Sequence, residues 1–403
     1  MTSRKLIHEF KTEAVTLFKG SRMNIRQERL CAEFTRCLMV LAAVLSLSAC
    51  AARPGPEVLR TTESRVLGAQ TVTIYAATTR ARATENANVF TSGRASQPNY
   101  ASFEISVPPS HQPGRIEWPE EQIDPQTSFA TVGQTILTQQ GFLQQVAGSG
   151  EGTQDVVIFV HGYNYSFPEA LYRLTQIAVD ADLEDTPILF AWPSQAAIAG
   201  YVADKESVTY SRDALTDLLG GLARDRRIGT ITVFAHSMGG WLTVEALRQL
   251  RLSGQDDIID RLTVVLAAPD IDVDVFRAQM QVIGPMTPPL AVLVSPDDQA
   301  LRVSSRISRT HVRVGALDIT DPRVQAAARE TGLAIIDISS VEATDGLNHD
   351  RYVRLATLYS RQRADGYDTP GLRIRQAGAF VFNTAGATLA SPFTIVGRAL
   401  AGE

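Results

Sequence analysis

The sequence of 403 residues is long enough for one large domain or two small ones. It is 44% hydrophobic and 20% charged, too apolar for a largely disordered chain, and it shows no repeat at a fixed period, which disfavours a solenoid or a propeller. The first 49 residues carry eight Lys and Arg against four Asp and Glu. The rest of the chain therefore carries 30 basic residues against 39 acidic ones. The acidic body therefore disfavours general binding to nucleic acid.

An apolar stretch near the N-terminus ends in a cysteine. Residues 38–48 (LMVLAAVLSLS) follow several arginines and are too few for a membrane-spanning helix, which needs roughly 18 residues or more. The next residues, Leu47-Ser48-Ala49-Cys50, resemble the lipobox of bacterial lipoproteins. The resemblance implies a signal peptide over residues 1–49, with Met23 as a possible true start, and a lipid anchor on the thiol of Cys50. The alternative is a short buried helix that ends in an ordinary cysteine.

All three cysteines lie before residue 51, so the body has neither a disulfide nor a Cys-based zinc site. Residues 50–70 begin AARPGP after the cysteine, a composition that predicts a flexible tether. Position 51 is Ala and not Asp. By resemblance to Gram-negative lipoproteins, this implies an outer-membrane location that faces the periplasm.

The next 290 residues or so, 71–361, are expected to form the main domain. Two early segments rich in β-branched and aromatic residues predict strands at 71–76 and 102–107, and the proline-rich stretch 107–127 reads as a loop. From residue 155, near-continuous Val/Ile/Leu runs predict buried parallel strands at 155–160, 187–192, 231–235, 262–268, 290–294 and 333–337. Helical stretches alternate with them at 167–181, 211–225, 239–251, 273–281, 299–307 and 321–331.

This alternation predicts an α/β fold with a mostly parallel, doubly wound sheet, helices on both faces and extra N-terminal strands. Residues 362–403 form a moderately apolar tail that is expected to pack on the domain surface. In sheets of this kind, functional residues gather beyond the carboxyl ends of the strands.

A serine stands at such a strand end. Ala235-His236-Ser237-Met238-Gly239 is the G-x-S-x-G nucleophile-elbow pattern with Ala in the first position, placed between a strand and a helix as the motif requires. Ala235 and Gly239 are small because the residues two before and two after the serine come close together. The elbow predicts Ser237 as the nucleophile, at a helix N-terminus that favours developing negative charge.

The order of an α/β-hydrolase triad is Ser, then Asp or Glu, then His. Asp298 follows the strand 290–294 and is the preferred acid, with Asp297 as the near alternative. Asp270 is the runner-up, although a solvated loop and a helix cap explain it better. The spacing of Asp270, Asp272 and Asp274 hints at calcium, but Val275 and Gln281 stand where an EF-hand loop needs Gly and Glu.

The base must follow the last strand, and His349 does. His311 precedes that strand and is expected on the surface. The oxyanion hole is expected to use the N–H of Met238, after the nucleophile, and the N–H of Tyr163, in a loop where Gly162 permits close approach. His161 comes too early in the chain for the base and is expected to pack beneath that loop.

Together these residues resemble a bacterial α/β-hydrolase family of unknown function, DUF900. The resemblance covers about residues 70–360 and rests on the segments IYAATTRAR (74–82), ISVPPSHQPGRIEWP (105–119), FVHGYNYSF (159–167), LFAWPSQ (189–195), Tyr201 with Asp204, FAHSMGG (234–240), LAAPDID (266–272) and SPDDQAL (295–301). It implies a serine hydrolase fold and triad but no substrate. Trp192 and Tyr201 fall on family positions without a known role, and we expect them in the core or the pocket wall.

The sequence therefore predicts an esterase or lipase-like serine hydrolase that needs neither metal nor organic cofactor. Its partners would be a small-molecule or lipid ester and the membrane that holds the anchor. A thioesterase, peptidase or acyltransferase could use the same triad. The alternative from another class is a catalytically idle envelope lipoprotein that acts as a binding scaffold.

Overall fold

A computed structural model describes residues 53–150, 152–308 and 312–355, together with the backbone of 394–396. The chain forms two units, residues 1–53 and 54–403, of which the second is described below. The expected signal peptide, Cys50, His311 and most of the C-terminal tail lie outside the described residues. No helix among those that are described is long and apolar enough to cross a membrane.

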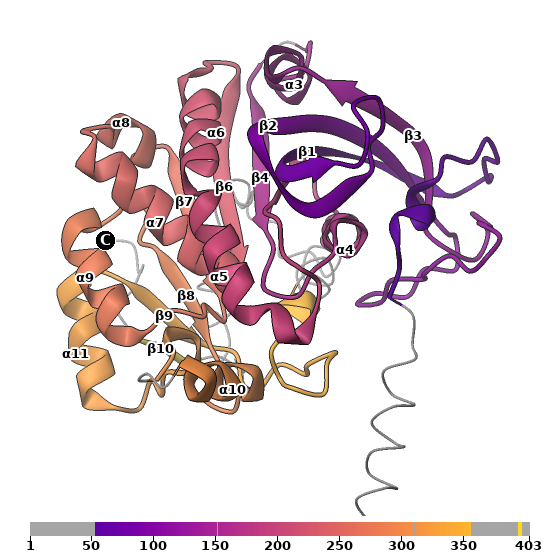
Figure 1. Cartoon of the computed structure of the whole chain (residues 1–403). Helices are drawn as coiled ribbons and strands as arrows, with labels where there is room; N and C mark the ends of the chain where they lie inside the picture. The colour runs from indigo at the N-terminus through magenta and orange to yellow at the C-terminus, as the bar shows by residue number, and fades with distance from the viewer. Residues whose placement is uncertain (1–52, 151, 309–311, 356–393, 397–403) are drawn as a thin grey trace, which may run out of the picture. The chain divides into compact units, whose positions relative to one another are not determined.

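The second unit is built on one mixed sheet, in the order β10-β9-β8-β7-β6-β4-β5-β1-β2-β3 (Figure 1). The strands from β1 through β5, β4, β6, β7 and β8 to β9 are parallel, while β2, β3 and β10 extend the sheet by antiparallel pairing. The strands are β1 Gln70–Arg82, β2 Phe90–Val107, β3 Ala130–Leu137, β4 Gln154–Val160, β5 Thr186–Ala191, β6 Ile228–His236, β7 Leu262–Ala267, β8 Ala291–Val294, β9 Ala334–Asp337 and β10 Thr394–Val396.

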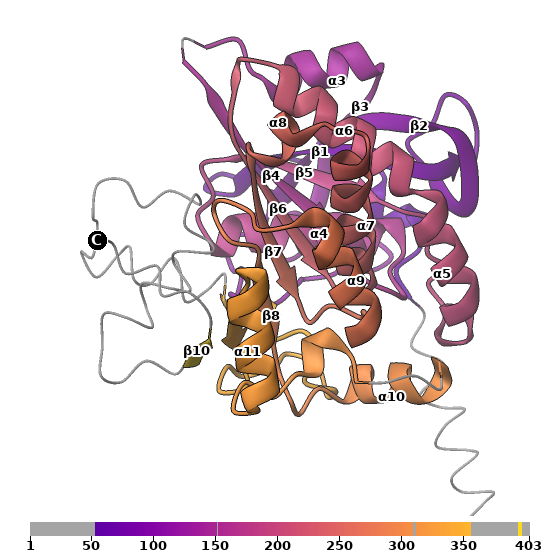
Figure 2. The same cartoon turned by 90° about the vertical axis from the view of Figure 1, so that its left-hand side faces the viewer.

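Helices cover both faces of this sheet (Figures 1 and 2). They are α3 Gln139–Val146, α4 Phe167–Asp180, α5 Tyr201–Tyr210, α6 Arg212–Arg224, α7 Met238–Leu252, α8 Asp256–Ile259, α9 Val273–Ile283, α10 Gln299–Ser308 and α11 Pro322–Thr331, with short 3₁₀ turns η1 Pro56–Leu59, η2 Ile198–Gly200 and η3 Val314–Ala316. The predicted α/β fold, with a mostly parallel sheet, helices on both faces and extra N-terminal strands, is confirmed.

The two faces of the sheet bury two separate apolar clusters. Alternate residues of β4 divide between them: Ile158 packs with α5, α6 and α7, and Phe159 packs with α4. Because successive strand side chains point to opposite faces, continuous apolar strands are what a sheet covered on both faces requires. Each fully buried Val or Ile contributes about 1.5–3 kcal/mol relative to exposure.

The domain begins earlier than the predicted boundary at residue 71. Val58 and Leu59 of η1 are buried in the cluster beneath α4, and the hydroxyl of Tyr172 donates a hydrogen bond of 2.9 Å to the carbonyl of Val58. The Pro- and Gly-rich composition around residues 54–56 suggests a linker, but these two apolar side chains fix η1 to the domain. Among the described residues, both clusters lie within 58–355, and residues 54–403 form one compact unit.

The parallel strands place one set of loops at a single edge of the sheet. The loops after β4, β5, β6, β7, β8 and β9 all leave from carboxyl ends, and they carry the residues that the sequence marks as candidates. In the tail, β10 pairs with β9 through Thr394, Ile395 and Val396, while the remaining residues after 355 lie outside the described residues.

Candidate active site

Ser237 stands in a sharp turn between β6 and α7. Its backbone has φ 54° and ψ −119°, and it is the residue that precedes the first turn of α7. A non-glycine residue in such a backbone conformation carries strain on the order of 1–3 kcal/mol, so contacts with the surrounding structure must hold the turn in place. Its N–H donates to the carbonyl of Ala267 at 2.9 Å, and its carbonyl accepts from the N–H of Asp270 at 3.1 Å. The loops after β6 and β7 thus fix this turn together.

Small residues are required where this turn meets the loop after β4. A Cβ on Gly239 would lie 2.4 Å from the carbonyl oxygen of Val160 and 2.5 Å from that of His161, contacts that no real Cβ makes. A Cβ on Gly162 would lie 2.7 Å from Nδ1 of His236 and 3.0 Å from Cβ of Ser237. The loop after β4 therefore lies directly against the turn that carries Ser237, and Ala235 is fully buried beneath it.

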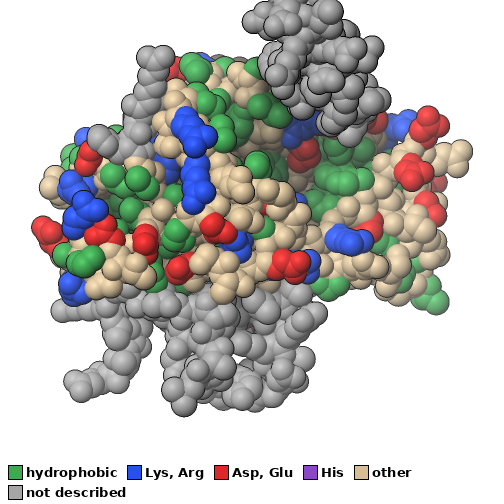
Figure 3. Space-filling model, turned by 90° about the horizontal axis from the view of Figure 1, so that it is seen from below, with side chains coloured by type: hydrophobic (Ala, Val, Ile, Leu, Met, Phe, Trp, Pro, Cys, Tyr) green, Lys and Arg blue, Asp and Glu red, His purple; other side chains and the backbone are tan. Residues whose placement is uncertain are grey.

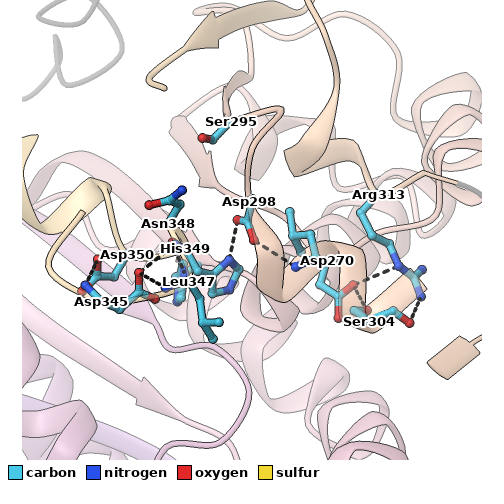
Figure 4. Close-up of polar contacts among 12 residues, drawn as sticks. Asp270, Ser295, Asp298, Ser304, Arg313, Asp345, Leu347, Asn348, His349 and Asp350 are labelled. Carbon is cyan, nitrogen blue, oxygen red and sulfur yellow. Dashed lines mark hydrogen bonds and ion pairs between the residues drawn. The ribbon is translucent and has the colours of Figure 1, made fainter. Parts of the chain in front are cut away.

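Asp298 and His349 meet at the same edge of the sheet. Nδ1 of His349 lies 2.6 Å from Oδ2 of Asp298, whose side chain is fully buried (Figure 4). The second oxygen of Asp298 accepts from the N–H of Leu301 at 2.9 Å, so the carboxylate is held at the start of α10. When Nδ1–H donates to this carboxylate, the lone pair of the neutral imidazole is on Nε2.

The environment of His349 raises the pKa of its imidazole above the usual 6.5. Burial by itself lowers this pKa, but the negative charge and hydrogen bond of Asp298 outweigh it, and the charges of Asp345 and Asp270 add to the effect. The cationic form of the ring is therefore stabilised, which is what an acid–base catalyst needs after it accepts a proton.

His236 connects the base to the nucleophile turn. Its ring centroid lies 4.6 Å from that of His349, and its Nε2 is 3.4 Å from the carbonyl oxygen of His349. Burial and the neighbouring His349 hold the pKa of His236 well below 6.5, so this ring is neutral. Because His236 directly precedes Ser237 in the chain, the contact brings the loop of His349 to the elbow.

The loop that carries His349 is held by acids that the sequence left without a role. Oδ1 of Asp345 accepts the N–H of His349 at 3.0 Å and that of Leu347 at 3.2 Å, and Asp350 in turn accepts the N–H of Asp345 at 2.9 Å (Figure 4). Burial, followed by the charge of Asp350, raises the pKa of Asp345. The D-x-x-x-H-D spacing of this loop was the available signal.

Asp297, the near alternative, faces away from the ring of His349. Its carboxylate binds Arg351 at 2.6 Å, the side-chain amide of Asn348 at 2.9 Å and the hydroxyl of Ser295 at 2.6 Å. It joins the β8–α10 loop to the His349 loop on either side of the histidine. The structure thus places Asp298 on the imidazole and Asp297 on its neighbours.

Asp270, the runner-up acid, lies in a buried cluster, so the expectation of a solvated loop and a helix cap at this residue was wrong. It pairs with Nε of Arg313 at 3.1 Å and accepts a hydrogen bond from the hydroxyl of Ser304 at 2.5 Å (Figure 4). The hydroxyl of Tyr201 donates to Asp270 at 2.8 Å. Asp272 caps α9 through the N–H groups of Asp274 and Val275. Among the described residues, no three His, Cys, Asp or Glu side chains lie close enough together to hold a metal ion.

Comparison with known proteins gives one family. The sequence model of a protein family described as "Alpha/beta hydrolase of unknown function (DUF900)" matches residues 139–364. The chain belongs to this family. It is also 28% identical over 125 residues to an uncharacterized protein of Nostoc sp. (strain PCC 7120), a match that covers 25% of this chain and 33% of that protein. The chain thus spans about a third of the length of this relative.

Several buried polar side chains hold the loop after β4 in place. Arg80 is fully buried and donates to the carbonyls of Tyr165 at 2.7 Å and Ser194 at 3.1 Å. Asp204 accepts from the hydroxyl of Ser194 at 2.5 Å and from the N–H of Asn164 at 3.4 Å. Burial lowers the pKa of Arg80 to about 10, so the side chain remains cationic at neutral pH.

His161 and Trp192 also belong beneath this loop and not among the reacting groups. Their rings stack with centroids 4.9 Å apart, and the indole N–H donates to the carbonyl of His161 at 2.8 Å. Burial, with the charge of Arg80, lowers the pKa of His161 to about 3, which keeps it neutral. Both residues are fully buried, as expected for packing positions.

Tyr163 follows Gly162 in the same loop. Its hydroxyl donates to the carbonyl of Ala197 at 3.1 Å and to that of Ile198, and its ring packs edge-on against Tyr201. The side chain therefore fixes the loop to η2, while its backbone follows the glycine at the elbow. The N–H of Met238 is in the first turn of α7, where N–H groups have no partner within the helix.

A separate hollow of about 750 Å³ lies between α9, η3 and α11. It is lined mostly by apolar side chains, among them Phe276, Met280 and Val324. None of its lining residues belongs to the turn of Ser237 or to the loops of Asp298 and His349. We therefore assign it no part in the chemistry.

Proposed function

We propose that this chain is a serine hydrolase that cleaves carboxylic esters through Ser237, His349 and Asp298. The observation that carries the proposal is the hydrogen bond of 2.6 Å between His349 and Asp298, together with the elbow that holds Ser237 at the start of a helix and whose preceding residue, His236, contacts His349. Membership of the α/β-hydrolase family supports a hydrolase; the ester substrate and the triad roles are our inference.

In this mechanism the hydroxyl oxygen of Ser237 attacks the ester carbonyl, and its proton passes to Nε2 of His349. The carboxylate of Asp298 holds the ring in the tautomer that can accept this proton and stabilises the resulting imidazolium. The imidazolium then protonates the leaving alcohol as the tetrahedral intermediate collapses to an acyl-enzyme. Water, deprotonated by His349, releases the carboxylic acid and restores the serine.

The backbone N–H groups of Met238 and Tyr163 are the proposed oxyanion donors. One such donor contributes roughly 3 kcal/mol to the stabilisation of the transition state. The close approach of Gly162 to Ser237, 3.0 Å for a Cβ built there, supports a donor from the loop after β4 at this place. The elbow turn supports the donor from α7.

We further propose that the mature protein is anchored in the bacterial envelope through Cys50, with the outer membrane as its site. The lipobox-like sequence before Cys50 and the first core residue at Val58 support a short link between anchor and domain. The lipid anchor makes an envelope ester accessible as substrate.

The test uses residues 54–403 and a panel of p-nitrophenyl esters of rising chain length, with a matched thioester and anilide. We expect saturable hydrolysis of at least one ester, lost by a factor of about 10⁴ or more in Ser237→Ala. Cleavage restricted to the thioester or the anilide would replace the ester assignment within the same mechanism. A folded protein without turnover of any substrate would favour the idle scaffold.

A further inference from the structure

Five apolar side chains are exposed at the edge of the sheet that carries the candidate site. They belong to η2, the first turn of α5, α10 and the His349 loop, and each is between 48% and 84% exposed: Ile198, Val202, Val303, Ile307 and Leu347. We call this set the apolar rim. Because η2, α10 and the His349 loop each follow the carboxyl end of a parallel strand, these side chains share the edge at which Ser237 lies.

Hydrogen bonds join the segments that carry the apolar rim. The carbonyl of Ile198 accepts from the hydroxyl of Tyr163, beside the elbow loop. Tyr201 of α5 shares a hydrogen bond of 2.8 Å with Ser304 of α10. The N–H of Gln299, at the start of α10, donates to the carbonyl of Leu347 at 2.9 Å, two residues before His349. The segments that carry the rim are therefore held to one another and to the loop of Tyr163.

The outward face of α10 adds positive charge to this margin. Leu301 and Ser304 are buried, whereas Arg302, Val303, Arg306 and Ile307 are exposed. Residues four apart lie on the same side of a helix, so two apolar and two cationic side chains form adjacent stripes along α10. Figure 3, which views the molecule from the side of α10, shows hydrophobic patches among charged side chains. A helix face of this composition suits the boundary between acyl chains and anionic headgroups.

We propose that the apolar rim and the cationic stripe of α10 dock on an anionic phospholipid surface, so that the acyl ester of a membrane lipid enters at Ser237. The substrate part of this inference rests on the proposed function, while the docking part does not. A lipid surface explains the mixed pattern, since apolar side chains enter the acyl region and the arginines meet phosphate. It also explains why exposed Val and Ile side chains occur on the segments that follow the carboxyl ends of these strands.

The test is flotation of residues 54–403 with vesicles of ether-linked phospholipid, which offer no ester to cleave. Binding is therefore measured independently of catalysis. We expect the protein to float with phosphatidylglycerol vesicles and to bind phosphatidylcholine vesicles at least tenfold more weakly. Val303→Ser with Ile307→Ser should weaken binding about tenfold, and Arg302→Gln with Arg306→Gln about 30-fold. The control is Leu252→Ser, which alters a residue 62% exposed at the far end of α7 and should leave binding unchanged.

Two results would overturn the proposal. One is the absence of flotation by a protein whose circular dichroism and melting temperature show that it is folded. The other is flotation that Leu252→Ser weakens as much as the α10 variants do. If the α10 variants instead dissociate a dimer seen by analytical ultracentrifugation and vesicle binding is absent, the rim is a contact between two copies of this chain. Loss of ester hydrolysis with intact flotation would refute the proposed function alone.

Discussion

Three aspartates near His349 should respond in three different ways when each is changed to Asn. Asp298 lies 2.6 Å from the imidazole, Asp297 binds Arg351 beside it, and Asp270 binds Arg313 in the core. The substitution keeps the shape of each side chain and removes its charge, so the contacts alone decide the outcome. The series thus separates a catalytic contact from two structural ones.

Asp298→Asn should lower kcat by about 10³–10⁴-fold, because the amide no longer selects the productive tautomer or stabilises the imidazolium. It should also lower the pKa of His349, since burial continues to disfavour the cation while the main opposing charge is gone. The acid limb of the remaining activity therefore shifts to lower pH. Thermal melting should change little in comparison.

The other two variants should affect folding more than chemistry. Asp270 and Arg313 are both almost fully buried, and breaking such a pair costs about 3–5 kcal/mol of unfolding free energy because a buried charge is left without its partner. The side chain of Asp297 is 46% exposed, so the loss of its ion pair should cost about 1 kcal/mol or less. Steady-state ester hydrolysis and urea unfolding of all three proteins provide the measurements. A loss of kcat in Asp297→Asn equal to that in Asp298→Asn would refute the assignment.

Three further predictions concern the elbow, the pH dependence and the anchor. Gly239→Ala should destabilise the domain by at least about 2 kcal/mol and abolish hydrolysis, because its Cβ would lie 2.4 Å from the carbonyl oxygen of Val160. A variant that is as stable as the wild type in urea and still hydrolyses esters would contradict this. The pH profile of kcat/KM should lose activity as the pH falls through a value above 6.5, since the base must be neutral and its pKa is raised; a midpoint below 6.5 would show that another group titrates. Full-length Cys50→Ser should remain uncleaved and lose its incorporation of labelled palmitate in cells; equal labelling of the variant would exclude the anchor.

The alternation of short apolar runs with helices made most of this fold predictable from the sequence. Each run that carries Val, Ile and Leu between turns is a strand, from β4 to β9, because a sheet buried on both faces leaves few polar positions in its strands. The β3 strand and α3 were missed, since Ala130–Leu137 is half exposed and polar on one side. The α5 helix was missed because Tyr201–Tyr210 has little apolar periodicity and is held by polar contacts such as those of Asp204.

The loops that carry the candidate site could be predicted from the sequence, but the residues that hold these loops in place could not. Chain order and position after strands selected Ser237, Asp298 and His349, and the structure brings Asp298 to His349. Sequence could not separate Asp297 from Asp298, because adjacent residues in one turn differ only in the direction of their side chains. The role of Arg80 depends on contacts with Tyr165 and Ser194, far along the chain, which no local pattern encodes. Asp345 holds His349 within one loop, where the short spacing of the two residues was the only signal.

The central claim is that Ser237 is a nucleophile activated by His349. Residues 54–403 should be incubated with a fluorophosphonate, and the modified residue located by peptide mass spectrometry. We predict a single adduct on Ser237, its rate reduced at least 10³-fold in His349→Ala and little changed in His311→Ala. Labelling of another residue, or labelling of Ser237 at the same rate in His349→Ala, would contradict the account.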